Sequence, residues 1–147
     1  MKDTSDKALK IQIVLASGRD GDRETLETAL SGTPWEPVPA TSKLEVLQSL
    51  HYAAVPIVLC DALFDKLPWQ TMLRGVLRVR RRACMILLTD DASPKLSTEV
   101  VRTGGFDLLT RPFEKEQVFA TLISAYTQCG VYRPTSARTR QASLVSG

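Results

Sequence analysis

Apolar residues along this chain fall into two patterns: short continuous runs, and longer stretches in which they recur every three or four positions. The continuous runs are rich in branched side chains and have the length of strands that are buried on both faces. They predict strands at residues 10–16, 56–60, 84–89 and 106–110. A fifth run, residues 35–40, contains two prolines and therefore predicts an edge strand, where a missing backbone donor is tolerated.

The periodic stretches lie between these runs and predict five helices. Four are expected at residues 23–30, 68–82, 94–103 and 114–126. The remaining helix follows a capping residue, Thr41 or Ser42, and its apolar residues at helical spacing are Leu44, Leu47 and Leu50. Asp22 is expected to cap the first helix. The last helix is expected to bury Phe119, Leu122, Ile123 and Tyr126.

Strands and helices alternate five times, which is typical of an α/β fold with a doubly wound parallel sheet. Right-handed crossovers leave few arrangements of five parallel strands. We expect the flavodoxin-like order 2-1-3-4-5, with helices on both faces of the sheet. Residues 9–128 would form this domain, after a flexible N-terminus at 1–8. Residues 129–147 would form a disordered basic tail or linker, and the simplest expectation is a stand-alone module.

Composition and charge narrow the function classes. The chain has 147 residues, of which 44% are hydrophobic and 24% charged, as in ordinary globular proteins. Its net charge of +3 comes from Arg133, Arg138 and Arg140, so the remainder is balanced and nucleic-acid binding is not expected. No apolar run is long enough to span a bilayer, and the N-terminus does not resemble a signal peptide. Cys60, Cys84 and Cys129 are expected to be buried free thiols of a cytoplasmic protein.

Candidate chemistry centres on Asp61, which directly follows the most apolar strand. Ligands of open α/β sheets bind at the carboxyl ends of the strands, so this carboxylate is well placed to react. The lone His51 has no partner at metal or triad spacing and is expected to be structural. The arginine run at Arg78 and 80–82 could bind an acidic partner, but a solvated helix end is the simpler expectation.

Four features in order along the chain resemble the receiver domain of bacterial two-component response regulators. Asp61 resembles the phospho-acceptor aspartate, and Thr89 resembles the switch hydroxyl that follows the fourth strand. The segment 104–113, GGFDLLTRPF, resembles the family's signature around the fifth strand, and Pro112 matches its cis-proline. The resemblance covers about residues 9–128. It implies a signalling domain rather than an enzyme, with a histidine kinase or a downstream signalling protein as partner.

The departures from that family fall on the chemistry. Where the family has two acidic Mg²⁺ ligands, this chain has Leu15 and Ala16, which supply no side-chain oxygen. The position of the family's phosphoryl-contacting lysine holds Arg111, which is expected to contact either a phosphoryl group or Asp61 itself. Leu108 occupies the aromatic switch position. With Asp61, only Asp20 or Asp22 could act as a substitute metal ligand, so either no cofactor or weak Mg²⁺ binding is expected.

Two interpretations follow from the resemblance. The first is a degenerate receiver, or pseudo-receiver, which acts through protein–protein contacts and forms a homodimer through residues 94–127. The second is a working receiver, phosphorylated on Asp61 by a histidine kinase, with an altered metal site. A hydrolase that uses Asp61 as its nucleophile would need a second aspartate at the position of Leu63 and is not expected. No membrane contact is expected either.

Overall fold

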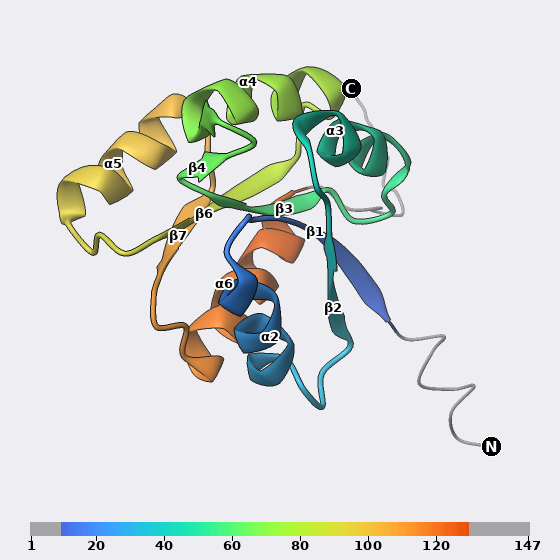
Figure 1. Cartoon of the computed structure of the whole chain (residues 1–147), viewed down its shortest axis with the longest axis vertical. Helices are drawn as coiled ribbons and strands as arrows, with labels where there is room; N and C mark the ends of the chain where they lie inside the picture. The colour runs from blue at the N-terminus through green and yellow to red at the C-terminus, as the bar shows by residue number, and fades with distance from the viewer. Residues whose placement is uncertain (1–9, 130–147) are drawn as a thin grey trace, which may run out of the picture.

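The computed structural model describes residues 10–129, which form a parallel sheet of five strands covered by helices on both faces (Figure 1). The strand order is β2-β1-β3-β6-β7, the flavodoxin-like order that the alternation of strands and helices predicted. The sheet strands are β1 (Ile11–Ala16), β2 (Trp35–Pro39), β3 (Ile57–Asp61), β6 (Cys84–Thr89) and β7 (Asp107–Thr110). The predicted edge position of the proline-containing strand, β2, is confirmed.

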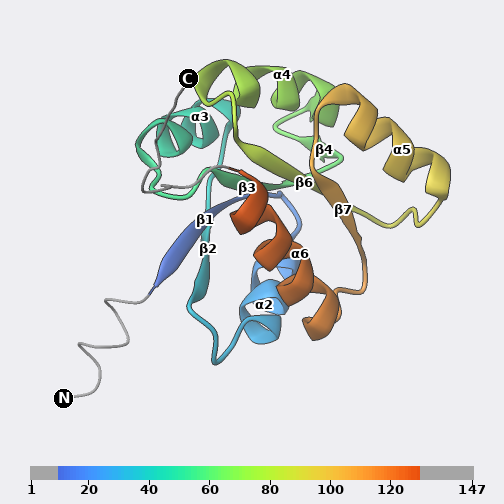
Figure 2. The same ribbon diagram turned by 180° about the vertical axis from the view of Figure 1, so that it is seen from behind.

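Helices cover both faces of the sheet, as both ribbon views show (Figure 2). The first layer contains α2 (Asp20–Ala29) and α6 (Lys115–Gln128). The second contains α3 (Lys43–Tyr52), α4 (Trp69–Val79) and α5 (Pro94–Thr103). Each layer buries one set of alternating strand side chains, which is why the central strands β3 and β6 are apolar at almost every position and fully buried.

The strand register brings the candidate residues to one end of the sheet. Asp61 is the last residue of β3 and pairs with Leu88 of β6. The next residue, Thr89, pairs with Thr110 at the end of β7. Arg111 therefore leaves β7 at the same carboxyl edge of the sheet, beside Asp61. Parallel strands place their carboxyl ends together, so the sequence positions of these residues fix their proximity.

A short hairpin between Asp61 and α4 was not predicted. It consists of β4 (Leu63–Phe64) and β5 (Leu67–Pro68), joined by a two-residue turn. Both turn residues have positive φ, 56° at Asp65 and 62° at Lys66, as a type I′ turn requires. The Asp65 carboxylate accepts a hydrogen bond from the Lys43 backbone N–H, which ties the hairpin to the first turn of α3.

Two buried-face predictions were wrong. In α6 the buried side chains are Val118, Thr121, Leu122 and Ala125, whereas Phe119, Ile123 and Tyr126 are exposed. The helix is apolar on two adjacent faces, so periodicity alone chose the wrong one. In α3, Leu44 is exposed and Val46 is buried with Leu50.

Two helix boundaries differ from the predictions by three residues each, and the others agree within two residues. The first helix begins at Asp20 rather than Arg23, with Arg19 at the N-cap position, so Asp22 lies inside the first turn and is not the cap. The α4 helix ends at Val79 rather than Arg82. Arg80 then donates hydrogen bonds to the carbonyl oxygens of Leu50 and Ala53, which satisfies acceptors at the end of α3.

The three cysteines are buried free thiols, as predicted. Cys129 is buried against the core, so it belongs to the domain and not to the tail in which it was placed. The predictions for residues 1–8 and 130–147 lie outside the described residues. Within residues 10–129, no helix is long and apolar enough to cross a membrane.

Candidate functional site

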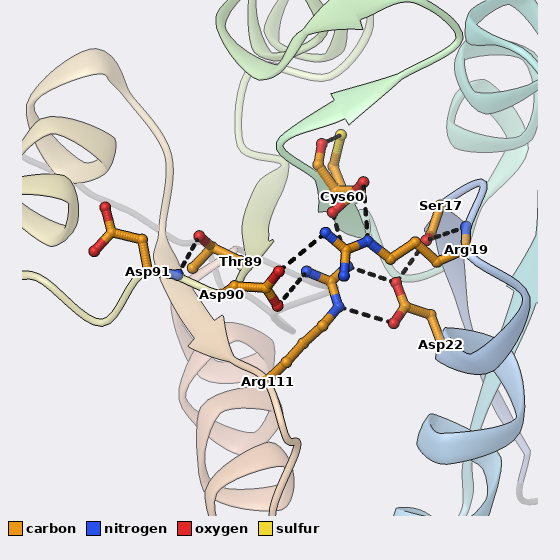
Figure 3. Close-up of polar contacts among 9 residues, drawn as sticks. Ser17, Arg19, Asp22, Cys60, Thr89, Asp90, Asp91 and Arg111 are labelled. Carbon is orange, nitrogen blue, oxygen red and sulfur yellow. Dashed lines mark hydrogen bonds and ion pairs between the residues drawn. The ribbon is translucent and has the colours of Figure 1, made fainter.

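The site is a cluster of charged side chains at the carboxyl edge of the sheet (Figure 3). Its members come from four places in the chain: the loop and first turn around α2, the end of β3, the loop after β6, and the residue after β7. They are Arg19, Asp22, Asp61, Asp90 and Arg111. Within the described residues the cluster thus sets two guanidinium groups against three carboxylates.

Arg111 is the centre of this cluster. Its Nε donates to Asp22 Oδ1 at 3.0 Å and its Nη2 donates to Asp22 Oδ2 at 2.6 Å, so the guanidinium forks onto that carboxylate. The same Nη2 donates to Asp61 Oδ1 at 2.7 Å. The guanidinium carbon lies 5.5 Å from the centre of the Phe113 ring, which supports the group from one side. The peptide bond between Arg111 and Pro112 is cis, as the resemblance implied.

The Asp22 side chain is nearly buried, and both of its carboxylate oxygens accept hydrogen bonds. Besides the fork from Arg111, its Oδ2 accepts a hydrogen bond from the Ser17 hydroxyl at 2.6 Å. Burial raises the pKa of this carboxyl, but the hydrogen bonds from Arg111 and Ser17, with the nearby positive charges, outweigh burial and lower it. The same hydrogen bond to Asp22 raises the pKa of Arg111. Both groups are therefore ionised, and they form a charge-assisted pair.

An outer pair closes the cluster on its solvent side. Arg19 Nη2 donates to Asp90 Oδ2 at 3.1 Å, and Arg19 Nε lies 4.0 Å from Asp61 Oδ2. Asp90 Oδ1 also lies 3.5 Å from Arg111 Nη1. This Nη1 is buried and makes no hydrogen bond within the described residues. Asp61 consequently faces a cation on each of its two oxygens.

Thr89 lies beside the cluster but does not join it. Its hydroxyl oxygen accepts a hydrogen bond from the Asp91 backbone N–H at 2.9 Å, and Asp91 in turn accepts from the Ser93 N–H. Ser93 caps α5. In Figure 3, Thr89 and Asp91 lie together, apart from Arg111 and Asp22. In this conformation Thr89 organises the loop that leads into α5.

The residues at the end of β1 and beside Asp61 contribute no polar group to the site. Leu15 and Ala16 are fully buried, one in each apolar layer. Burial raises the pKa of the Cys60 thiol to about 12, with a further contribution from the Asp61 charge. Its sulfur donates to the Asp61 carbonyl oxygen, so this cysteine is protonated at neutral pH and is a poor nucleophile.

The structure thus brings together three of the residues selected from the sequence: Asp61, Arg111 and Asp22. It contains the Arg111–Asp61 ion pair that the sequence offered as one of two roles for Arg111. Asp20 is exposed and lies outside the cluster. Sequence reasoning missed Arg19 and Asp90, whose side chains meet across 71 residues of sequence. The one signal for Asp90 was its place directly after a predicted strand.

The sequence matches no protein-family model, and it matches no curated protein. Solved structures do match. The signal receiver domain of an HD domain-containing protein from Pseudomonas fluorescens Pf-5 gives a TM-score of 0.69 at 22% identity, over 82% of this chain and 89% of that one. This chain has the receiver-domain fold.

Two further receiver structures give the same result. Chemotaxis response regulator CheY4 of Vibrio cholerae has a TM-score of 0.67 at 18% identity, over 79% of this chain and 98% of that one. The beryllofluoride-activated NtrC4 receiver domain dimer has a TM-score of 0.70 at 14% identity, over 80% and 98%. All three identities are low, so the similarity defines the fold and leaves the chemistry to the residues of the site.

The receiver fold implies a Mg²⁺ ion beside Asp61, and the residues present do not fit one. Mg²⁺ needs several oxygen ligands in near-octahedral geometry. Here Arg111 Nη2 lies between Asp22 and Asp61 and is hydrogen-bonded to both, so a guanidinium already occupies the place between the two carboxylates. Among the described residues, no cluster of three or more acidic, histidine or cysteine side chains is arranged to hold a metal.

Proposed function

We propose that this protein is a pseudo-receiver: a signalling domain with the receiver fold that does not depend on Mg²⁺-assisted phosphorylation and acts through protein–protein contacts. The observation that carries the proposal is the double hydrogen bond from Arg111 Nη2 to Asp22 and Asp61. One guanidinium is hydrogen-bonded to both carboxylates, and Arg19 adds a second positive charge near Asp61. The positive charge that a receiver draws from a metal ion is here supplied by the chain itself.

The geometry argues against easy phosphoryl transfer to Asp61. Phosphoryl transfer depends almost entirely on positioning and on neutralisation of the phosphoryl oxygens by cations. Asp61 Oδ1 is hydrogen-bonded to Arg111, and Oδ2 faces Arg19. A phosphoryl donor would have to displace at least one of these contacts, and the buried apolar pair Leu15 and Ala16 offers no metal ligand in exchange.

The proposed output surface is the face that contains residues 94–127. Large apolar side chains are exposed on both of its helices, Val101 on α5 and Phe119 and Ile123 on α6, whereas the exposed Tyr126 packs edge-on against Trp35 of the opposite edge strand β2. Residues that a sheet domain leaves exposed in this way favour contact with another protein. Homodimerisation through this face is one form of that contact; the NtrC4 receiver domain forms a dimer when activated by beryllofluoride. A histidine kinase or a downstream signalling protein is the alternative partner.

The test is an NMR titration of the ¹⁵N-labelled protein with Mg²⁺ and beryllofluoride, a mimic of the phosphoryl group. The pseudo-receiver predicts no saturable shift of the Thr89 and Arg111 amides at millimolar concentrations. Arg111→Lys removes the fork while keeping a charge, and Arg102→Lys, on the exposed end of α5, is its matched control. Shifts in the wild type that need both Mg²⁺ and an intact Asp61, and that vanish in Asp61→Asn, would refute the proposal.

The second candidate is a working receiver phosphorylated on Asp61, and one observation favours it. Asp22 places a carboxylate in the site from a position where receivers of the usual pattern do not need one, so it could replace the missing acidic pair if Arg111 swung away. This candidate predicts that Asp22→Asn abolishes any Mg²⁺-dependent shift. The pseudo-receiver predicts that wild type and Asp22→Asn are equally silent.

A further inference from the structure

A group of arginines lies at the amino end of the sheet, opposite the carboxyl edge that carries Asp61. Arg74 and Arg78 are one turn apart on the exposed side of α4, and Arg81 and Arg82 follow in the turn that leads into β6. We call these four residues the arginine surface. In Figure 2, α4 lies along the top of the molecule, and the chain descends from its end into β6.

Within residues 10–129, no acidic side chain forms an ion pair with the arginine surface. Between Asp65 and Asp90 the chain has six basic residues and no acidic one. Among the described residues, the ion pairs involve only Arg19, Arg23 and Arg111 as cations. The four arginines are exposed, and Arg74 and Arg78 repel each other at a spacing of one helical turn.

Stability does not account for this arrangement. A helix C-terminus favours cations only within its last turn, and α4 ends at Val79, so the dipole favours Arg78 but not Arg81 or Arg82. The neighbouring Arg80 differs from them because its guanidinium donates hydrogen bonds to carbonyl oxygens at the end of α3. The helix dipole therefore accounts for one arginine of the run, Arg78, whereas Arg81 and Arg82 are exposed beyond the end of the helix.

A hollow of about 340 Å³ adjoins the arginine surface. It is lined by Arg82, Gly104, Gly105, Phe106 and Gln128, with Ala83 and Cys84 at its base. A Cβ at Gly105 would stand 2.7 Å from Val100 Cγ1, so only glycine fits at this position of the lining without a shift of its neighbour. The half-buried Phe106 makes one wall apolar. The hollow is large enough for one side chain of a partner.

We propose that the arginine surface and this hollow form a docking site for an acidic segment of a partner protein, with one apolar side chain of that segment packed against Phe106 in the otherwise mainly polar hollow. Arginine forks match carboxylates in geometry and charge. A nucleic acid is disfavoured because the chain without its last three arginines carries as many acidic as basic residues, so it lacks the broad field that draws a polyanion. The residues after Cys129 contain three arginines and no acid, so they do not complement the site.

The site is remote from Asp61, and the proposal is independent of whether Asp61 is phosphorylated. The test uses fluorescence anisotropy with a labelled peptide of alternating glutamate and alanine that carries one central leucine. Its counterpart has alanine in place of the leucine. We expect the leucine peptide to bind more tightly, because the hollow accepts its side chain. A variant with Arg78→Gln, Arg81→Gln and Arg82→Gln should bind both peptides about tenfold more weakly, which corresponds to about 1.4 kcal/mol in total, or roughly 0.5 kcal/mol per charge.

The matched control removes the same charge elsewhere, with Lys10→Gln, Arg23→Gln and Lys115→Gln, all exposed. It should bind like the wild type. An equal loss of peptide affinity in the control variant would show that only net charge matters and would overturn the proposal. So would the absence of binding at millimolar peptide. Tighter binding of an oligothymidylate, or of phosphatidylserine vesicles, than of the glutamate peptide would assign the surface to nucleic acid or membrane instead.

Discussion

The sharpest prediction concerns removal of the central guanidinium by Arg111→Ala. In the folded protein the side chains of Arg111, Asp22 and Asp61 are 12%, 6% and 11% exposed. Without Arg111, Asp22 keeps only the Ser17 hydroxyl, and Asp61 keeps only a distant contact with Arg19. Two nearly buried carboxylates would then stand in one pocket without a close cation.

The expected cost follows from that burial. Removal of one partner from a buried ion pair costs about 3–5 kcal/mol, because the other charge stays desolvated. This pocket opens to water at Asp90, which is 62% exposed, so we expect a value of about 2–4 kcal/mol. The exposed pair Arg23–Glu27 offers the matched control, since an i,i+4 pair of this kind contributes about 0.3–0.5 kcal/mol. Arg23→Ala should therefore be nearly neutral.

The assay is urea unfolding at neutral pH, followed by the fluorescence of the buried Trp35 and Trp69. A double-mutant cycle with Asp22→Ala isolates the pair, and we expect a coupling energy of at least about 2 kcal/mol between Arg111 and Asp22. A loss in Arg111→Ala no larger than that in Arg23→Ala, with negligible coupling to Asp22, would show that the network adds nothing to stability. The structural role that we assign to Arg111 would then be wrong.

Three other predictions test separate features. The hydrogen bonds to Asp22 outweigh burial and lower its pKa. The contribution of Asp22 to the free energy of unfolding is therefore complete above its ordinary pKa of 3.8, and it is lost as the pH falls through the pKa of the folded state. Urea unfolding measured over a pH series should show this loss in the wild type and not in Asp22→Asn. Gly105→Ala should lower stability by about 1–3 kcal/mol in thermal melts, because its Cβ would clash with Val100, whereas Gly21→Ala has open space and should raise it by about 0.4–1 kcal/mol. Lys66→Gly should raise stability by about 1 kcal/mol by relieving a φ of 62°, and an unchanged melting temperature would contradict that.

The sheet could be predicted from the sequence because its central strands leave no ambiguity. Strands β3 and β6 are buried on both faces, so almost every position is apolar and the pattern has one interpretation. The α6 helix shows the opposite case. Its residues 118, 122 and 125 and its residues 119, 123 and 126 both form apolar stripes, and only packing against the sheet and α2 decides which stripe is buried.

The residues of the site show the same contrast between positions that strand order fixes and positions that tertiary packing fixes. Asp61 ends β3 and Arg111 follows β7, and the strand order places both at the carboxyl edge of the sheet with only β6 between their strands. Asp22 reaches the site from α2, 89 residues from Arg111 in sequence. Its local sequence suits a helix cap, and nothing local distinguishes a cap from a carboxylate that pairs with a distant arginine. The contact depends on where the first turn of α2 lies over the sheet, which is a property of the tertiary structure.

The departures from the receiver pattern are consistent with one another when they are considered together. Positions 15 and 16 hold Leu and Ala, which offer no metal ligand, so without a metal ion Asp61 needs another counter-charge. A lysine at position 111 would supply a single point charge, whereas the planar fork of arginine holds two carboxylates from two separate elements at once. Asp22 gives that fork its second partner and ties α2 to the end of β7. A charge cluster of this kind stabilises one conformation, as the proposed pseudo-receiver requires.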